Sequence, residues 1–312
     1  MRPAPACTMN SGRDSRKLEW TNEMDKRPRR LIKVFKMDIK KLGIIGVGAM
    51  GSTMVRVIVN RGIIKPENIN AHDINLERLE MVKEELGINI DCSSNAELVA
   101  SSDTILMAVK PQELKHVLEG MAPALDPSKA IITIVTGVPM SFYWQVTGKQ
   151  FPISRVMPNT PALVHAGVSC VSFNELVSVT QKRDCITILK AIGTTHEVPE
   201  KYLDAVTGLS GSGPAYVYYI LEGLTDGGVK MGLPRDLSRS LATDTIIGSL
   251  KLMKETGKHP MLLKDQVTSP GGTTIDALHV LENENLKGIL IKAVEVASLK
   301  SRHLSNQFKD PE

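Results

Sequence analysis

A glycine-rich loop between a short apolar run and a helical pattern is the feature that most restricts the fold of this chain. The run Leu42-Gly43-Ile44-Ile45 predicts a buried strand, and the loop Gly46-Val47-Gly48-Ala49-Met50-Gly51 follows it directly. Residues 49–61 then predict a helix that ends at Gly62. A strand, a G-x-G-x-x-G loop, a helix and a second strand roughly 20 residues further on are typical of a dinucleotide-binding βαβ unit.

Each glycine of the loop has a separate physical task. Gly46 permits the tight turn, and Gly48 has no Cβ, so a pyrophosphate can approach the amides at the helix N-terminus. Gly51 lets the helix pack closely on the strand. A purely structural glycine turn is the alternative. We therefore predict that the cofactor is held by Gly46, Val47, Gly48, Ala49, Met50 and Gly51.

Asp73 follows the second predicted strand, residues 69–72, and precedes a helix over residues 75–86 that Gly87 ends. A carboxylate in this place accepts hydrogen bonds from the adenosine ribose and repels the 2′-phosphate of NADP, so Asp73 favours NADH over NADPH. Asp73 also suits the N-cap of the following helix, and both roles can hold. Arg78 lies close in sequence and weakens the preference.

The order of the predicted elements defines an α/β class with two domains. Up to about residue 198, apolar runs such as 103–109 and 130–136 alternate with helical patterns, which predicts a parallel, Rossmann-like, doubly wound sheet with helices on both faces. From residue 199 the strand patterns cease and helices such as 214–231 and 286–297 follow. We expect a dinucleotide-binding domain over residues 37–198 and an all-helical dimerisation domain over residues 199–312.

The helix that begins near Pro214 is apolar nearly all round over residues 215–221. Such a helix has to be buried on every side. A helical domain of roughly 110 residues cannot easily do this alone, so the pattern indicates completion by a second subunit.

The net charge of +4 is unevenly distributed. Residues 1–36 hold ten Lys and Arg residues against four acidic ones, whereas the rest of the chain holds 28 basic and 30 acidic residues. The predicted folded part is therefore not a basic nucleic-acid binder. The leader has little apolar periodicity and is expected to be disordered. Its four acidic residues favour a cytoplasmic protein, with mitochondrial targeting as the alternative.

The cysteines Cys7, Cys92, Cys170 and Cys185 form no C-x-x-C pair, and no two histidines have helical metal-ligand spacing. We expect reduced thiols and no metal site. No stretch approaches the roughly 18 apolar residues of a membrane span, so no membrane partner is expected.

Longer motifs make the chain resemble a known family. They are Ala108–Pro111, Met157-Pro158-Asn159-Thr160-Pro161, the block at residues 204–216 with its extension at 226–234, and Ser269-Pro270-Gly271-Gly272-Thr273-Thr274 with its continuation to residue 278. Together they resemble pyrroline-5-carboxylate reductases from about residue 41 to 305. The resemblance implies NAD(P)H-dependent reduction of 1-pyrroline-5-carboxylate to L-proline, the last step of proline synthesis. It also implies a homodimer with interlocked helical domains, commonly assembled as a decamer of five dimers.

The resemblance also implies site residues. Thr274 would donate a hydrogen bond to the imine nitrogen, and the helix start after Ser269 would hold the substrate carboxylate; simple helix capping is the alternative for Thr273 and Thr274. Lys110 is open to a loop role and Asn159 to a turn role. The substrate candidates are Ser269, Gly271, Gly272, Thr273 and, more weakly, Glu200. The further cofactor candidates are Asn95, Ala108, Val109, Lys110, Pro111, Thr136, Gly137 and Asn159.

Two other functions compete with this one. A related imine or hydroxyacid dehydrogenase would normally carry a catalytic lysine on the helix that opens the helical domain, and here none occurs until Lys230. A redox-sensing dinucleotide binder without turnover would not need a second anion site at Ser269–Thr274.

Overall fold

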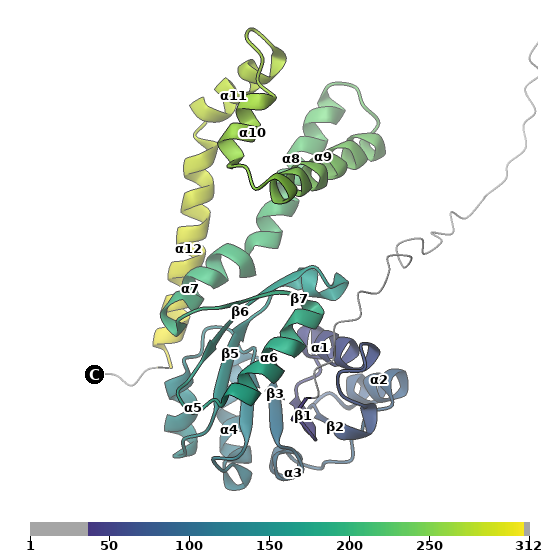
Figure 1. The fold of residues 1–312 in the computed structure, drawn as a ribbon, viewed down its shortest axis with the longest axis vertical. Coiled ribbons are helices and arrows are strands. Elements are labelled where there is room, and N and C mark those ends of the chain that lie inside the picture. Colours follow the sequence, from purple (N-terminus) through teal and green to yellow (C-terminus); the bar gives the residue numbers. More distant parts are fainter. Residues whose placement is uncertain (1–36, 309–312) are drawn as a thin grey trace, which may run out of the picture. The chain divides into compact units, whose positions relative to one another are not determined.

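The computed structural model describes residues 37–308, and the leader expected over residues 1–36 lies outside them. Within the described residues, seven strands form one sheet in the order β2-β1-β3-β4-β5-β6-β7 (Figure 1). Their bounds are β1 Leu42–Ile45, β2 Ile69–His72, β3 Thr104–Met107, β4 Ala130–Thr133, β5 Ile153–Met157, β6 Gly167–Phe173 and β7 Gly193–Glu197.

The first five strands are parallel, as the alternation of strands and helices predicts. The expectation of a wholly parallel sheet is wrong for β6, which pairs antiparallel with β5. Only the short 3-10 turn η5 (Thr160–Val164) lies between these two strands, and a connection that short cannot carry the crossover a parallel pair needs. From β1 the chain runs to β2 on one side and then to β3 on the other, so the switch point lies beside the glycine loop.

Helices cover both faces of the sheet (Figure 1). One buried apolar cluster joins α1, α2 and α6 to one face, and a second joins α3, α4 and α5 to the other. Every residue of β1, β3 and β4 is buried, because helices pack against both faces of the sheet. The helices are α1 Ala49–Asn60, α2 Leu76–Leu86, α3 Asn95–Ala100, α4 Leu114–Met121, α5 Met140–Thr147 and α6 Val179–Ile192.

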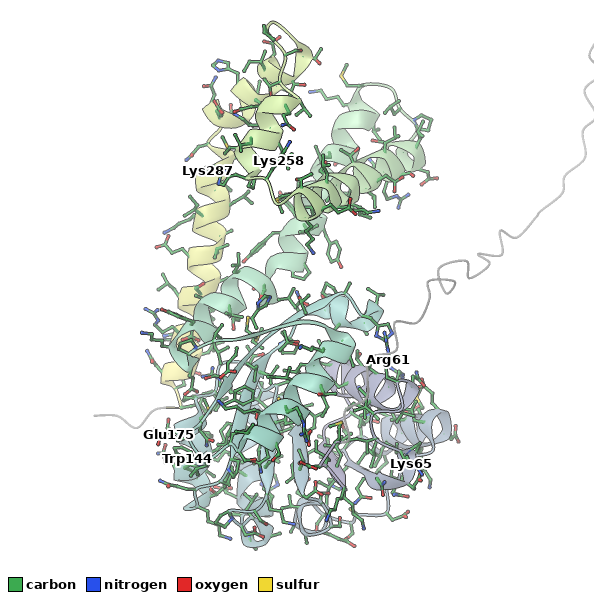
Figure 2. All side chains as sticks on the ribbon, viewed as in Figure 1. Arg61, Lys65, Trp144, Glu175, Lys258 and Lys287 are labelled. Carbon is green, nitrogen blue, oxygen red and sulfur yellow. The ribbon has the colours of Figure 1, made fainter. Side chains whose placement is uncertain are left out.

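Local signals place the helix ends where the sequence predicts them. Gly62, which follows the C-cap Arg61 of α1, and Gly87, the C-cap of α2, both have positive φ angles, 62° and 69°. On α5, the indole of Trp144 (Figure 2) donates to the Phe151 carbonyl at 3.3 Å and holds the helix end against the start of β5.

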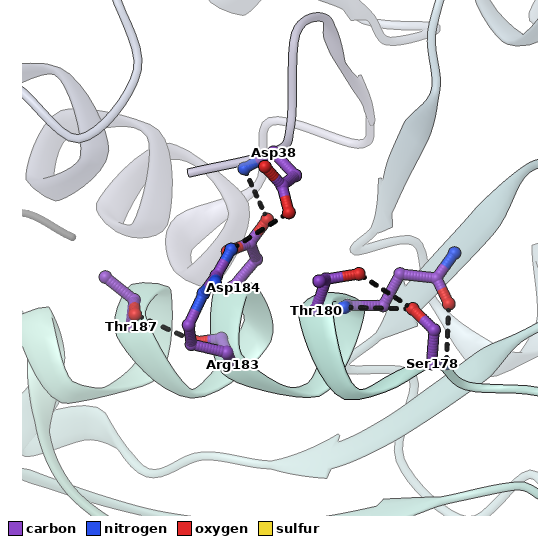
Figure 3. Close-up of polar contacts among 7 residues, drawn as sticks. Asp38, Ser178, Thr180, Arg183, Asp184 and Thr187 are labelled. Atoms are coloured by element: carbon purple, nitrogen blue, oxygen red, sulfur yellow. Dashed lines mark hydrogen bonds and ion pairs between the residues drawn. The ribbon is translucent and has the colours of Figure 1, made fainter. Parts of the chain in front are cut away.

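The start of α6 is fixed by its own cap and by the segment before β1. Ser178 and Gln181 form a reciprocal capping box. The buried carboxylate of Asp184 accepts the Asp38 amide at 2.8 Å, and Arg183 bonds to both carboxylates (Figure 3). The residues just before β1 are thereby tied to a helix about 145 positions later in the chain.

After β7 the described chain is helical, which confirms that the strands cease near residue 199. The long helix α8 contains the apolar run and begins at Gly213 with Pro214 in its first turn. The described residues 37–308 all fall in one compact unit, so the domain boundary at 198/199 stays a prediction. The helices are α7 Leu203–Val206, the π-helical turn η7 Thr207–Gly211, α8 Gly213–Lys230, α9 Arg235–Thr256, α10 Pro260–Gln266, α11 Thr273–Asn283 and α12 Leu286–Asn306.

In the described part of the chain, Cys92, Cys170 and Cys185 are all free, as expected. Burial raises the pKa of the Cys185 thiol to about 12, so this group stays protonated and inert. Over the same residues, no helix has the length and apolar character needed to cross a membrane, and no group of three or more His, Cys, Asp or Glu side chains is arranged to hold a metal ion.

Candidate functional site

The glycine loop leaves β1 at the carboxyl edge of the sheet and leads directly into α1. Gly46 has φ +96°, and its amide donates to the His72 carbonyl at 2.9 Å, so the turn is tied to the end of β2. Gly48 is the N-cap of α1 and provides no side-chain cap. The first amides of α1 therefore lack a side-chain acceptor from the cap residue, as an anion-binding helix start requires.

A cavity of about 610 Å³ lies over this helix start. Its volume falls within the roughly 300–1,000 Å³ of small-molecule sites. Sequence reasoning missed its far wall, Glu113, His116 and Val117 on and before α4, because no local motif marks these residues. Six of the predicted cofactor residues line the cavity: Gly46, Gly48, Asp73, Asn95, Val109 and Lys110.

Asp73 does not cap α2, so that alternative is wrong; the N-cap is Asn75, whose side chain accepts the Arg78 amide. The Asp73 carboxylate instead accepts the Val47 amide at 2.7 Å and the Asn75 amide at 2.8 Å. It thus ties the glycine loop to the turn after β2. Arg78 lies near the loop, because a Cβ added to Gly48 would lie 3.9 Å from its guanidinium.

Asn95 lines the cavity and also carries a buried polar atom without a partner. It is the first residue of α3, behind the N-cap Ser94, and its Oδ1 is buried with no hydrogen-bond partner among the described residues. A buried amide oxygen without a partner costs free energy unless a ligand or water satisfies it. The Asn95 side chain therefore needs a donor that the described residues do not supply.

The other predicted cofactor residues do not line the cavity. Val47 is fully buried in the core and Met50 packs against the same cluster. The Val47 amide is already bound to Asp73, so it is not free for a pyrophosphate. Outside the cavity lining are Ala49 at the start of α1, Gly51, Ala108 after β3, Pro111 in the turn before α4, and Thr136 and Gly137 after β4.

Asn159 and Glu200 have protein partners. The Asn159 amide donates to the Ser210 carbonyl at 3.1 Å and accepts the Val168 amide at 2.8 Å, which joins β6 to the π-helical turn η7. Glu200 accepts from Met140 and Arg155. The turn role of Asn159 is thus observed, and the binding roles of both residues stay predictions.

The loop at residues 269–274 forms a turn that opens α11. The Gly272 amide bonds to the Ser269 carbonyl at 3.1 Å, and Gly271 has φ +65°. Gly272 is the N-cap, with no side-chain cap, so neither Thr273 nor Thr274 caps the helix as the alternative supposed. The first amides of α11 have no side-chain acceptor at the cap, and none of the residues lining the cavity comes from this loop.

Both the strand-containing part and the helical part of the chain are similar to known proteins. Residues 41–137 match a family model described as NADP oxidoreductase coenzyme F420-dependent, and residues 200–304 match one described as pyrroline-5-carboxylate reductase dimerisation. A pyrroline-5-carboxylate reductase of Glycine max is 42% identical over 85% of this chain and 96% of its own length, and that of Escherichia coli is 35% identical over 85% and 98%. The chain belongs to the pyrroline-5-carboxylate reductase family.

Solved structures of pyrroline-5-carboxylate reductases have the same fold. The Plasmodium falciparum enzyme, described with NADP bound, is 39% identical, has a TM-score of 0.78 and matches 86% of this chain and 99% of its own. The Coxiella burnetii enzyme is 32% identical with a TM-score of 0.79, over 85% and 98%. Membership therefore extends over both the strand-containing and the helical part of the chain.

Proposed function

We propose that this protein reduces 1-pyrroline-5-carboxylate to L-proline with a nicotinamide dinucleotide. The observation that carries the proposal is a glycine-loop cavity in a chain that spans nearly the whole length of several pyrroline-5-carboxylate reductases. The direct test is loss of absorbance at 340 nm when the protein is mixed with pyrroline-5-carboxylate and NADH or NADPH. No loss with either cofactor would contradict the proposal.

The residues present suit a dinucleotide. Gly48 leaves the helix start open to a pyrophosphate, and Asn95 lines the same cavity with an amide whose oxygen has no protein partner. The bound nicotinamide would supply hydride to the C=N carbon. The protein's own contribution is positioning and electrostatics, because a hydrogen bond donated to the imine nitrogen makes the C=N carbon more electrophilic.

We infer that the start of α11 binds the substrate. Its uncapped amides suit the substrate carboxylate, and Gly271 and Gly272 allow close approach. The Thr274 hydroxyl, in the first turn, has a free donor to offer the imine nitrogen. Because the helical part lacks a closed core of its own, we place this loop beside the cofactor of a partner subunit in a homodimer, with five dimers forming a decamer.

Replacing Thr274 by alanine tests the hydrogen bond. We expect kcat/KM to fall about ten- to a hundredfold, the range for one bond to a charged group. Thr274→Ser keeps the hydroxyl and is expected to retain most of the activity. A value within twofold of wild type for Thr274→Ala would remove the proposed role.

We further propose that NADH is preferred over NADPH. Asp73 places a negative charge beside the predicted adenosine ribose, where it repels a 2′-phosphate, while Arg78 partly offsets it. Because Asp73 also holds the Val47 amide, its removal should weaken both cofactors as well as change their ratio.

The matched variants Asp73→Asn and Asp73→Ser separate these two effects. Both remove the charge, and we expect both to narrow the ratio of KM for NADPH to KM for NADH by about tenfold. Only Asp73→Asn keeps an acceptor of similar length for the loop amide, so it should weaken NADH less than Asp73→Ser does. An unchanged ratio in both variants would show that Asp73 acts only on the loop.

We also propose that the protein works in the cytoplasm, because four acidic residues in the leader are unfavourable in a mitochondrial transit peptide. Recovery of the protein from the mitochondrial fraction of its source cells would contradict this.

A further inference from the structure

The Glu200 carboxylate joins three separate segments of the chain. Its Oε1 accepts the Met140 amide at 2.8 Å and an Nη1–H of Arg155, also at 2.8 Å. The Arg155 side chain is only 9% exposed, and its guanidinium forms an ion pair with this carboxylate, which is 33% exposed. Glu200 itself begins the short helical turn η6 (Glu200–Tyr202), where the chain enters its helical part.

The bond to Met140 caps a helix. Met140 is the first residue of α5, and the N-cap before it is Pro139, which has no side-chain acceptor. The first amides of a helix need acceptors from outside the helix, and a carboxylate is favoured there by the helix dipole. Glu200 therefore supplies, from 60 positions away in the sequence, the cap that the local sequence lacks.

This cap fixes one end of the turn at residues 136–139. The other end is held at β4, where the Thr133 hydroxyl accepts the Val135 amide at 3.2 Å. The same hydroxyl lies 2.5 Å from that of the buried Tyr143, a residue of α5. The turn thus connects β4 to α5. Tyr143 binds α5 to β4, and Glu200 with Arg155 binds it to β5.

The turn lies at the carboxyl edge of the sheet, the edge that carries the glycine loop. It follows β4, and the strand order from the loop is β1-β3-β4. The residues that line the cavity include those that follow β3 and those on α4. Because β4 is the neighbour of β3, the turn at residues 136–139 lies beside the cavity along this edge of the sheet. In doubly wound sheets a dinucleotide lies across the switch point outside these strand ends, with its second half beyond the first βα turn.

We propose that Glu200 is a positioning residue that holds the turn at residues 136–139 against the nicotinamide half of the cofactor. This rests on the proposed function for the identity of the cofactor. It is an alternative to the direct substrate contact expected for Glu200, because Oε1 already accepts from Met140 and Arg155 and a substrate contact would have to use Oε2. Neither the cap nor the ion pair touches the adenosine half, whose cavity is lined only by residues 45–120.

Two ligands that differ only by the nicotinamide ring test this. We would measure the affinity of wild type, Glu200→Ala and Glu200→Gln for NADH and for ADP-ribose, or for NADPH and 2′-phospho-ADP-ribose if NADPH is preferred. Glu200→Ala should weaken the complete cofactor about tenfold, the loss of roughly one charged hydrogen bond, and leave the ADP-ribose compound within twofold. Glu200→Gln keeps an acceptor for Met140 and should lose about threefold.

The matched control is Glu197→Gln, which removes a carboxylate paired with Lys182 at 3.3 Å on the exposed edge strand β7. It should change neither affinity. An equal loss of both ligands in the Glu200 variants would show general destabilisation and overturn the proposal. Unchanged cofactor affinity with a raised KM for pyrroline-5-carboxylate would also overturn it, in favour of a substrate contact. Because binding is measured, a wild type that binds NADH without turnover refutes the proposed function and not this inference.

Discussion

Replacing Gly51 by alanine is expected to lower the thermal unfolding midpoint by about 10 °C and to abolish cofactor binding. A Cβ at this position would overlap the Gly46 carbonyl oxygen and lie 3.1 Å from the Ala108 side chain. Both neighbours are fixed, since Ala108 is hydrogen-bonded to Ile45 at 2.8 Å beside the sheet. The strain can be relieved only by moving α1 away from β1, at a cost of about 3 kcal/mol.

Gly48→Ala is the comparison that separates folding from binding. A Cβ on Gly48 has no protein atom nearer than Arg78 at 3.9 Å, and the backbone angles, φ −62° and ψ −173°, are ordinary for alanine. We expect its unfolding midpoint to stay within about 2 °C of wild type. Its Kd for NADH should nevertheless rise about a hundredfold, because the methyl group occupies the approach to the helix amides. Calorimetry and NADH fluorescence titration check both values.

Equal melting temperatures for the two alanine variants would contradict this division of roles between the glycines. Normal NADH binding by Gly48→Ala would place the pyrophosphate elsewhere in the cavity.

The sequence predicts the glycine loop and the first three strands well because their signals are local. An apolar run, a glycine and a helical period act over a few residues, and β1, α1 and the stop at Gly87 follow them closely. The antiparallel β6 could not be predicted in this way, since strand direction depends on the length of the preceding connection and not on the composition of the strand.

In the candidate site, too, the residues marked by local sequence signals could be predicted and the long-range contacts could not. Gly46, Gly48 and Asn95 line the cavity as predicted. The most distant partners of Asp73, Asn159 and Glu200 lie 26, 51 and 60 positions away in the sequence, and no sequence period reports contacts at such distances. The start of α11 could be predicted from its glycines, but none of its residues lines the cavity of the single chain.

Replacing Tyr219 by aspartate is expected to convert the protein to a monomer without turnover. Tyr219 lies on α8 and is 84% exposed in the single chain, although the run around it is apolar. In the helical part, α8, α9, α11 and α12 expose further large apolar side chains and bury few residues among themselves. Apolar surface on this scale is not left in water by a stable protein, so we expect a second copy to cover it.

The expected size of the effect follows from symmetry. An unpaired carboxylate buried at a twofold interface costs at least about 3 kcal/mol in each subunit, so the dimer is weakened by about 6 kcal/mol, or roughly ten-thousandfold. Val179→Asp on α6 is the matched control, because Val179 is also 84% exposed but lies on the sheet-covering layer. It should leave the mass of the assembly, measured by light scattering, unchanged.

The Tyr219→Asp monomer should still bind NADH with an affinity near that of wild type. The cavity is lined only by residues 45–120, none of which belongs to the helical part. Turnover should fall more than a hundredfold, because in the proposed homodimer the start of α11 lies beside the cofactor of the partner subunit. A monomer that retains full activity would show that one chain completes its own site. An unchanged oligomer would place the dimer contact away from Tyr219, while loss of NADH binding together with turnover would mean that the dinucleotide site itself depends on assembly.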